Sequence, residues 1–77
     1  MGTRPQHSPK YRRLCKLLRT YRAESELTQR ALALRLRKPH SYVYKVEHGE
    51  RRIDPVEFVD WCKACRVDPA EAIGEIG

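Results

Sequence analysis

The feature that most constrains the fold is a three-residue break, Arg37-Lys38-Pro39, between two short segments of helical periodicity. Pro39 disfavours helical geometry at the residue before it and cannot donate a backbone hydrogen bond, so one continuous helix is excluded. The apolar residues that share a face are Leu32, Ala33 and Leu36 before the break, and Val43 and Val46 after it. This pattern predicts two short helices packed across a tight turn, with Ala33 as the small residue where their axes cross.

Capping signals divide the rest of the chain into three further helices. Ser8-Pro9 places a capping hydroxyl before a Pro at the first helical position. Asp54-Pro55-Val56-Glu57 adds a capping-box Glu, and Asp68-Pro69-Ala70-Glu71 repeats that pattern. The expected helices run from Pro9 to a connection at 24–27, from Thr28 to about Leu36, from Pro39 or His40 to Glu47, from Pro55 to about Ala64, and from Pro69 to near Gly74. Gly49 is expected to end the third helix in the left-handed conformation.

Charge is unevenly distributed along the chain. Residues 1–52 hold 14 Lys and Arg against four Asp and Glu, whereas residues 53–77 hold two against six. A domain that is basic on one side and acidic on the other suits a polyanion that contacts one face only. A solvated basic surface has the same composition, so charge alone does not decide between these interpretations.

The length of 77 residues suits one small domain and leaves little room for an enclosed active site. We expect a flexible basic arm over residues 1–7 and a single domain over residues 8–77. No apolar run reaches the ~20 residues that cross a membrane, and the start lacks the apolar core of a signal peptide. We therefore expect a cytoplasmic protein that makes no membrane contact.

The cysteines predict no disulfide framework, because their number, three, is odd. Cys62-Lys-Ala-Cys65 has the spacing of half a zinc site, but no matching second half follows, so we expect no metal and no cofactor. Both cysteines fall in a helical stretch, where residues three apart share a face. Core packing is their expected role.

Several short sequence motifs, at the spacing they have here, are typical of one family. They are Leu27-Thr28-Gln29, Ala33, Leu36, the run Ser41-Tyr-Val-Tyr-Lys-Val-Glu-His-Gly-Glu-Arg-Arg52, and the closing Cys62-Lys-Ala-Cys-Arg-Val-Asp-Pro69. In these motifs the chain resembles the Xre/Cro family of helix-turn-helix domains, the family of the lambdoid phage repressors, over about residues 9–74. The resemblance implies an all-α, compact five-helix bundle whose third helix lies in the major groove of DNA.

Three positions depart from the family's pattern. Arg37 stands where the turn usually holds Gly, and a non-Gly residue in the left-handed conformation costs about 1 kcal/mol. Lys38 replaces the usual apolar plug, although the stem of a Lys can cover apolar surface. Arg66 replaces the Gly that usually ends the fourth helix. The fold is still expected, with a turn that is either mildly strained or differently shaped.

By the family's pattern, the start of the third helix carries the base-reading residues, His40, Ser41, Tyr44 and Lys45. Each base pair shows a distinct set of donors and acceptors in the major groove, so polar side chains are needed there. Lys45 can donate to guanine O6 and N7, and His40 can donate or accept. Tyr44 suits a thymine methyl or the sugar-phosphate edge. A plain solvent-exposed helix surface is the alternative.

Phosphate contacts fix position and carry no sequence information. Gln29 resembles the family's phosphate-clamping Gln at a helix N-terminus, where exposed backbone amides favour an anion. The full set of expected phosphate contacts is Gln29, Tyr42, His48, Arg51, Arg52, Arg37 and Lys38. Each cation in this set could instead be merely solvated.

Arg22 and Glu47 are expected to form a structural ion pair. The family often pairs an Arg near the end of the first helix with a Glu near the end of the third, and this pair orients the recognition helix. Both residue types stand at these positions here.

One recognition helix reads only a few base pairs, so useful specificity calls for a homodimer on an inverted-repeat operator. The fourth helix carries more apolar surface than one core face requires. Its two stripes are Val56, Val59 and Cys62, and Phe58, Trp61 and Cys65. One stripe is expected to face the core and the other, with Ile73 and Ile76, to form the dimer surface.

The leading prediction is a sequence-specific regulator of transcription, a repressor or a related phage or mobile-element control protein, whose partner is double-stranded DNA. The alternative is an interaction module that binds a protein partner, as an antitoxin binds its toxin. The dense basic face with polar, groove-reaching residues favours DNA. An enzyme is not expected, because the sequence shows no nucleophile–base arrangement, glycine-rich phosphate loop or paired carboxylates in an apolar setting.

Overall fold

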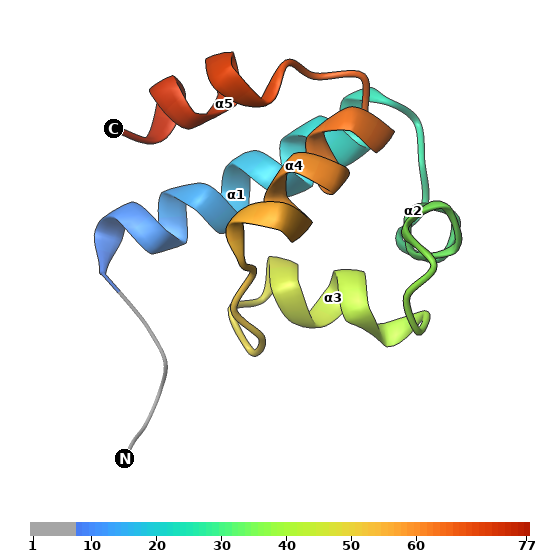
Figure 1. Cartoon of the computed structure of the whole chain (residues 1–77). Helices are drawn as coiled ribbons and strands as arrows, with labels where there is room; N and C mark the ends of the chain where they lie inside the picture. Colours follow the sequence, from blue (N-terminus) through green and yellow to red (C-terminus); the bar gives the residue numbers. More distant parts are fainter. Residues whose placement is uncertain (1–7) are drawn as a thin grey trace.

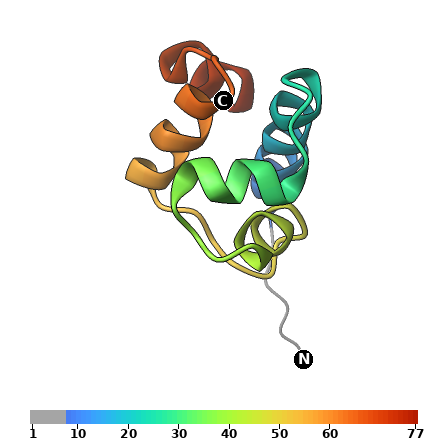
Figure 2. The ribbon, with the colours of Figure 1, turned by 90° about the vertical axis from the view of Figure 1, so that its right-hand side faces the viewer.

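The computed structural model describes residues 8–77, and these residues form five α-helices and no strand. The helices are α1 (Pro9–Glu24), α2 (Gln29–Leu36), α3 (Ser41–Glu47), α4 (Pro55–Ala64) and α5 (Pro69–Ile76). α3 and α5 lie at opposite ends of the molecule, with α1 and α4 between them (Figure 1, Figure 2). The predicted all-α bundle is confirmed, whereas the predicted arm over residues 1–7 lies outside the described part of the chain.

The helix starts follow the predicted caps. The Ser8 hydroxyl accepts from the Tyr11 N–H at 3.0 Å. At α4 the capping box is complete, since Asp54 accepts from the Glu57 N–H at 2.7 Å and Glu57 accepts from the Asp54 N–H at 3.1 Å. At α5 the pattern is met only in part: Asp68 accepts from the Ala70 N–H, without a capping box. α5 also continues two residues past Gly74, where the sequence analysis expected it to fade.

The connections after α1, α2, α3 and α4 share one left-handed geometry. In the turn after α2, Arg37 has φ 57°, its N–H donates to the Leu34 carbonyl at 3.1 Å, and the Lys38 N–H donates to the Ala33 carbonyl at 3.0 Å. These two bonds define a Schellman motif, and equivalent pairs follow the other three helices. The left-handed residues are Glu26, Arg37, Gly49 and Arg66. The sequence analysis expected the turn at Arg37 to be either mildly strained or differently shaped. The structure shows the first: the turn keeps its usual shape, with Arg37 in the strained left-handed conformation.

The core fills the space between the helices with large apolar side chains. Trp61 is completely buried, and its indole Nε1 donates to the Leu18 carbonyl at 3.2 Å, which ties α4 to α1. Ala33 is 1% exposed, as expected for a small residue at the contact between α2 and α3. The other fully buried large side chains are Leu18, Leu32, Val43, Val46 and Cys62.

Burial also decides which stripe of α4 faces the core. Phe58, Trp61 and Cys65 are buried, but so is Cys62, which the sequence analysis had placed in the opposite stripe. Cys62 follows Val56 by six residues, which at 3.6 residues per turn places it about 120° away around the helix. Only Val56 and the half-buried Val59 therefore remain on the outer face. The three cysteines are free and buried, and burial raises the pKa of Cys62 to about 11, which keeps its thiol protonated.

Candidate nucleic-acid interface

α3 has one buried face and one polar face. Val43 and Val46 are fully buried against the core. The predicted base-reading residues at and after the helix start are exposed: His40, Ser41, Tyr44 and Lys45. Because residues one turn apart share a helix face, these four side chains point away from the bundle together. α3 itself lies at one end of the molecule, so this face is open to a large partner (Figure 1).

Tyr44 is held in place although it is exposed. Its ring stacks on the ring of His48, with the centroids 3.9 Å apart and the planes tilted by 25°. His48 also places Nδ1 2.9 Å from the Tyr44 carbonyl oxygen. The aromatic pair therefore forms one ordered surface from Tyr44 to the end of α3.

Glu47 anchors α3 to the rest of the domain. Its carboxylate accepts from Arg22 Nε at 2.6 Å and from a second nitrogen of the same guanidinium at 3.2 Å. It also accepts from Gln29 Nε2 at 3.0 Å, and its side chain is 1% exposed. The predicted Arg22–Glu47 ion pair is therefore confirmed. Together with the bond from Gln29, it connects α1, the start of α2 and the end of α3, and so fixes the orientation of α3.

Gln29 is part of this network, which the sequence analysis did not predict. Its amide nitrogen donates to Glu47, and its side chain is half-buried at the first position of α2. The amide keeps one further N–H for an outside acceptor. Its predicted contact with a phosphate stays a prediction, now with an internal partner that orients the amide.

Tyr42 does not line the interface, so the prediction that it contacts a phosphate is wrong. The residue is 4% exposed and its ring packs on Trp61, with centroids 6.2 Å apart. The phenol oxygen is buried and has no hydrogen-bond partner among the described residues. Burial raises the pKa of Tyr42 to about 12. Tyr42 is a core residue because its ring packs on Trp61 of α4, within the buried cluster of the domain.

Two of the predicted phosphate-contacting cations flank the Tyr42 ring. Lys38 Nζ lies 5.1 Å from the ring centroid and the Arg51 guanidinium carbon 4.9 Å from it. Both cations also bond to one oxygen of Glu57, Lys38 at 3.1 Å and Arg51 at 2.8 Å. Glu57 thus joins the turn before α3 to the loop after it. Its role in capping α4 was predictable, but this second role was not.

The Glu57 carboxyl responds to several opposing influences. Burial raises its pKa, but the hydrogen bond from the Asp54 N–H and the bonds from Lys38 and Arg51 outweigh burial and leave it below its usual value. The ionised form is therefore favoured. This carboxylate offsets part of the positive charge of Lys38 and Arg51 while it holds both side chains in place.

The two remaining predicted cations, Arg37 and Arg52, differ in their contacts with the rest of the domain. Arg37 is exposed in the turn between α2 and α3. Arg52 places its guanidinium carbon 4.2 Å from the centroid of the Tyr11 ring, and the Tyr11 hydroxyl accepts from the Ile53 N–H at 3.2 Å. The loop between α3 and α4 is therefore fixed to the start of α1. Tyr11 is a further residue of the candidate site, and the sequence analysis did not predict it.

None of the helices in residues 8–77 is long and apolar enough to cross a membrane.

The chain matches a family model described as a helix-turn-helix domain over residues 13–72. A comparison with curated proteins gives no match.

Among solved structures, an XRE-family like protein from Pseudomonas syringae pv. tomato str. DC3000 is 39% identical to this chain, with a TM-score of 0.83. That match covers 87% of this chain and 82% of the other. Two structures of the clp gene regulator ClgR from Corynebacterium glutamicum are 24% and 25% identical, with TM-scores of 0.79 and 0.78. They cover 91% and 94% of this chain, and 91% and 76% of their own chains. The chain belongs to the Xre family of helix-turn-helix proteins.

Proposed function

We propose that this domain is a sequence-specific DNA-binding regulator of transcription that reads the major groove with α3. The observation that carries the proposal is the division of α3 into a buried face and a polar face that nothing in the described structure covers. An α-helix fits the major groove, and helix-turn-helix domains insert the second helix of the motif there. A gene-regulator description for a structure that is 25% identical is consistent with this role.

The base-reading set in this proposal is His40, Ser41, Tyr44 and Lys45. Lys45 donates to guanine, whereas His40 and Ser41 stand at the helix start, where side chains reach base edges most easily. Tyr44, stacked on His48, offers a flat apolar edge to a thymine methyl or to the backbone. The stack reduces the conformational freedom that Tyr44 has to lose on binding.

The phosphate contacts in this proposal surround that set on three segments. Gln29 lies at the start of α2, Arg37 and Lys38 lie in the turn before α3, and His48, Arg51 and Arg52 lie at or after its end. Four of these six residues are Lys or Arg, and each phosphate that such a cation neutralises makes affinity fall with salt with a slope of roughly −0.9. Because Glu57 engages Lys38 and Arg51, each of these two adds less than a free cation.

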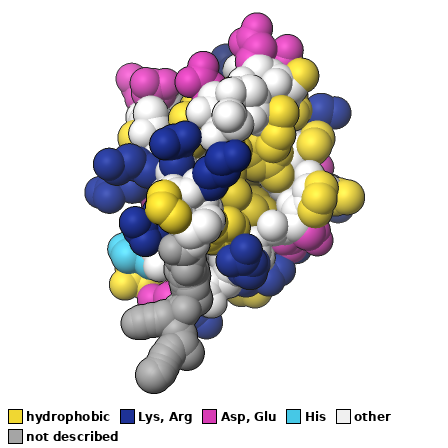
Figure 3. Space-filling model, turned by 90° about the vertical axis from the view of Figure 1, so that its left-hand side faces the viewer, with side chains coloured by type: hydrophobic (Ala, Val, Ile, Leu, Met, Phe, Trp, Pro, Cys, Tyr) yellow, Lys and Arg dark blue, Asp and Glu magenta, His cyan; other side chains and the backbone are white. Residues whose placement is uncertain are grey.

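A homodimer on an inverted-repeat operator completes the proposal. Val56 is 70% exposed on the outer face of α4, and Ile73, which is 56% exposed, lines an apolar groove with Pro55, Phe58 and Val59. Figure 3 shows the hydrophobic side chains on this side of the molecule in one strip, beside Lys and Arg side chains. Exposed apolar strips of this kind mark interaction surfaces. Ile76, also expected there, packs against the core instead. A dimer that covers its operator denies that DNA to other proteins, which is the simplest form of repression.

The same strip supports the second candidate function. A protein partner, such as the toxin of a toxin–antitoxin pair, could occupy the surface of Val56 and Ile73 in place of a second copy. In that case α3 would be free to bind DNA or to remain unoccupied. The two candidates differ in whether the chain alone selects a symmetric DNA sequence.

The experiment that tests the proposal is selection from a random duplex DNA library at near-physiological salt. The wild type and the His40→Ala/Ser41→Ala/Lys45→Ala variant are run in parallel. We expect the wild type to enrich an inverted repeat with half-sites about 10 base pairs apart, and the variant to lose that enrichment. Absence of any enriched sequence, or identical enrichment by the variant, contradicts base reading by α3 and favours a protein partner.

A further inference from the structure

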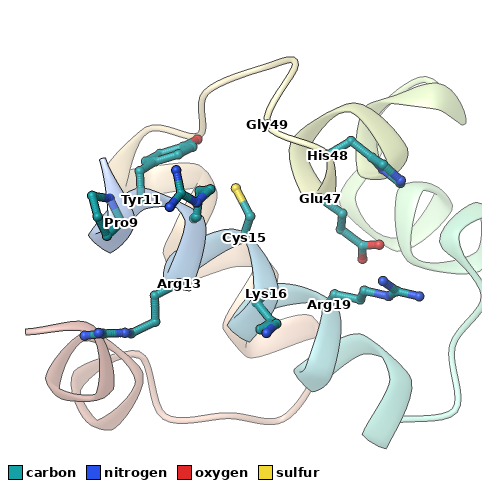
Figure 4. Close-up of a pocket in the computed structure, with 10 residues that line it drawn as sticks. Pro9, Tyr11, Arg13, Cys15, Lys16, Arg19, Glu47, His48 and Gly49 are labelled. Carbon is teal, nitrogen blue, oxygen red and sulfur yellow. The ribbon is translucent and has the colours of Figure 1, made fainter. Parts of the chain in front are cut away.

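An open groove runs between the first half of α1 and the end of α3, and it shares His48 with the set of contacts proposed above. Its volume is about 630 Å³. α1 forms one wall, from Pro9 to Arg19, and Glu47, His48 and Gly49 form the other (Figure 4). The groove is large enough for a phosphate and its flanking sugars.

The α1 wall carries cations that the fold does not neutralise. Lys16 and Arg19 are exposed, and within residues 8–77 neither makes a hydrogen bond or an ion pair. Arg13 differs, since its guanidinium donates to the Ile76 carbonyl at 3.2 Å and points toward α5 (Figure 4). Arg12 also lines the groove. Lys16 and Arg19 lie three residues apart and therefore on the same side of the helix.

The opposite wall adds little negative charge. Glu47 is the only carboxylate that lines the groove, and its oxygens already accept from Arg22 and Gln29. Figure 4 shows the Arg19 side chain extending from α1 toward the side where Glu47 and α3 lie. The groove is therefore basic on one side and electrically almost neutral on the other.

The groove continues the proposed DNA surface. His48 forms part of it and is also a proposed phosphate contact at the end of α3. Tyr11 lines it and carries Arg52 on its ring, which places α1 directly beside the α3–α4 loop. Among the described residues that line the groove, the one acidic side chain between the cations of the loop and those of α1 is Glu47, whose carboxylate already accepts from Arg22 and Gln29.

We propose that Lys16 and Arg19 bind the phosphate backbone of the DNA strand that borders the half-site read by α3. The inference rests on the proposed function, because α3 in the major groove brings a phosphate strand past His48 and into the α1 groove. The contacts read no bases, since an ammonium and a guanidinium on this wall face backbone. They add affinity to specific and non-specific DNA alike.

The test is the salt dependence of binding, measured by fluorescence anisotropy, for a Lys16→Gln/Arg19→Gln variant. The probes are a random-sequence 30-base-pair duplex and a duplex of the sequence that the library selection enriches. Loss of two phosphate contacts reduces the slope of log affinity against log salt by about 1.8, which is about 30-fold in affinity at 0.15 M salt. Both duplexes should lose affinity by the same factor.

The matched control is Arg35→Gln/Lys63→Gln. Both residues are exposed on the α2–α4 side, where they line a different hollow with Asp60. The control removes the same net charge away from the groove, and both double variants should keep the urea midpoint of the wild type. We expect the control to keep the wild-type slope.

Equal slopes for the two double variants overturn the inference and leave base reading by α3 intact. The inference is also overturned if the Lys16→Gln/Arg19→Gln variant loses more affinity for the selected duplex than for the random one. That result would mean that Lys16 or Arg19 reads bases. If the wild type binds neither duplex even at low salt, the inference and the proposed function both fail.

Discussion

Replacement of Glu47 by Ala should destabilise the domain more than any other single change to a charged residue at the interface. The carboxylate is 1% exposed and accepts three hydrogen bonds, two from Arg22 and one from Gln29. After the change, the Arg22 side chain, 14% exposed in the wild type, keeps one bond from Nη1 to the Leu27 carbonyl. A mostly buried guanidinium then lacks its counter-charge.

The size of the effect follows from this geometry. Removal of one partner of a buried ion pair costs about 3–5 kcal/mol, because the remaining charge is uncompensated. A chain of 77 residues has a total unfolding free energy of roughly 4–12 kcal/mol. The variant is therefore expected to lose a quarter or more of its stability, and at the lower end of that range it would be largely unfolded.

Urea denaturation measures this loss, and the fluorescence of Trp61, the only Trp and fully buried, reports unfolding. With an m value of about 1 kcal/mol/M for a protein of this size, the midpoint should fall by about 3 M. The control is a double-mutant cycle with Arg22→Met, since removal of both charges costs less than the sum of the single changes. A midpoint shift below 1 M, or additive single changes, refutes the reasoning.

Four further substitutions test the turn strain, the buried phenol and the Glu57 carboxylate. Arg37→Gly and Arg66→Gly relieve left-handed strain of about 1 kcal/mol each, less the entropy that Gly adds to the unfolded chain, so calorimetry should show a higher Tm for each variant; a lower Tm contradicts the strain. Tyr42→Phe removes a buried hydroxyl without a partner and should raise stability by roughly 1 kcal/mol with unchanged DNA affinity; weaker binding would restore Tyr42 as a phosphate contact. Glu57 has a folded-state pKa below its usual value, so its contribution to stability is present above pH 4.5 and is lost as the pH falls through the folded-state pKa. The wild type should therefore lose more stability than Glu57→Gln between pH 5 and pH 2, and parallel pH profiles of urea midpoints would contradict this.

Local signals sufficed for most of the fold. Ser8, Asp54 and Asp68 each satisfy a backbone N–H within three residues, so the helix starts depend on few distant contacts. The Arg22–Glu47 pair came from a family resemblance and not from periodicity, because the two residues are 25 positions apart. The base-reading and phosphate-contacting roles, apart from that of Tyr42, stay predictions.

The features that the sequence could not predict depend on which helix surfaces contact each other in the folded bundle. A Tyr side chain is polar enough to be exposed and apolar enough to be buried, so the sequence does not determine the burial of Tyr42. Its burial depends on Trp61, which packs against it in the folded domain. Glu57 is recognisable as a cap, but its bond to Lys38 spans 19 positions and requires the assembled bundle. Lys16 and Arg19 read as an ordinary solvated face until the end of α3 is placed beside them.

The most direct test of the central claim, that α3 reads bases in the major groove, is methylation protection on the selected duplex. Dimethyl sulfate attacks guanine N7, which lies in the major groove and is an acceptor for Lys45 in this account. We expect the wild type to protect guanines symmetrically in two half-sites about one helical turn apart, and the Lys45→Ala variant to leave them reactive. Bound protein that leaves guanine N7 fully reactive, or that protects only minor-groove positions, contradicts the claim.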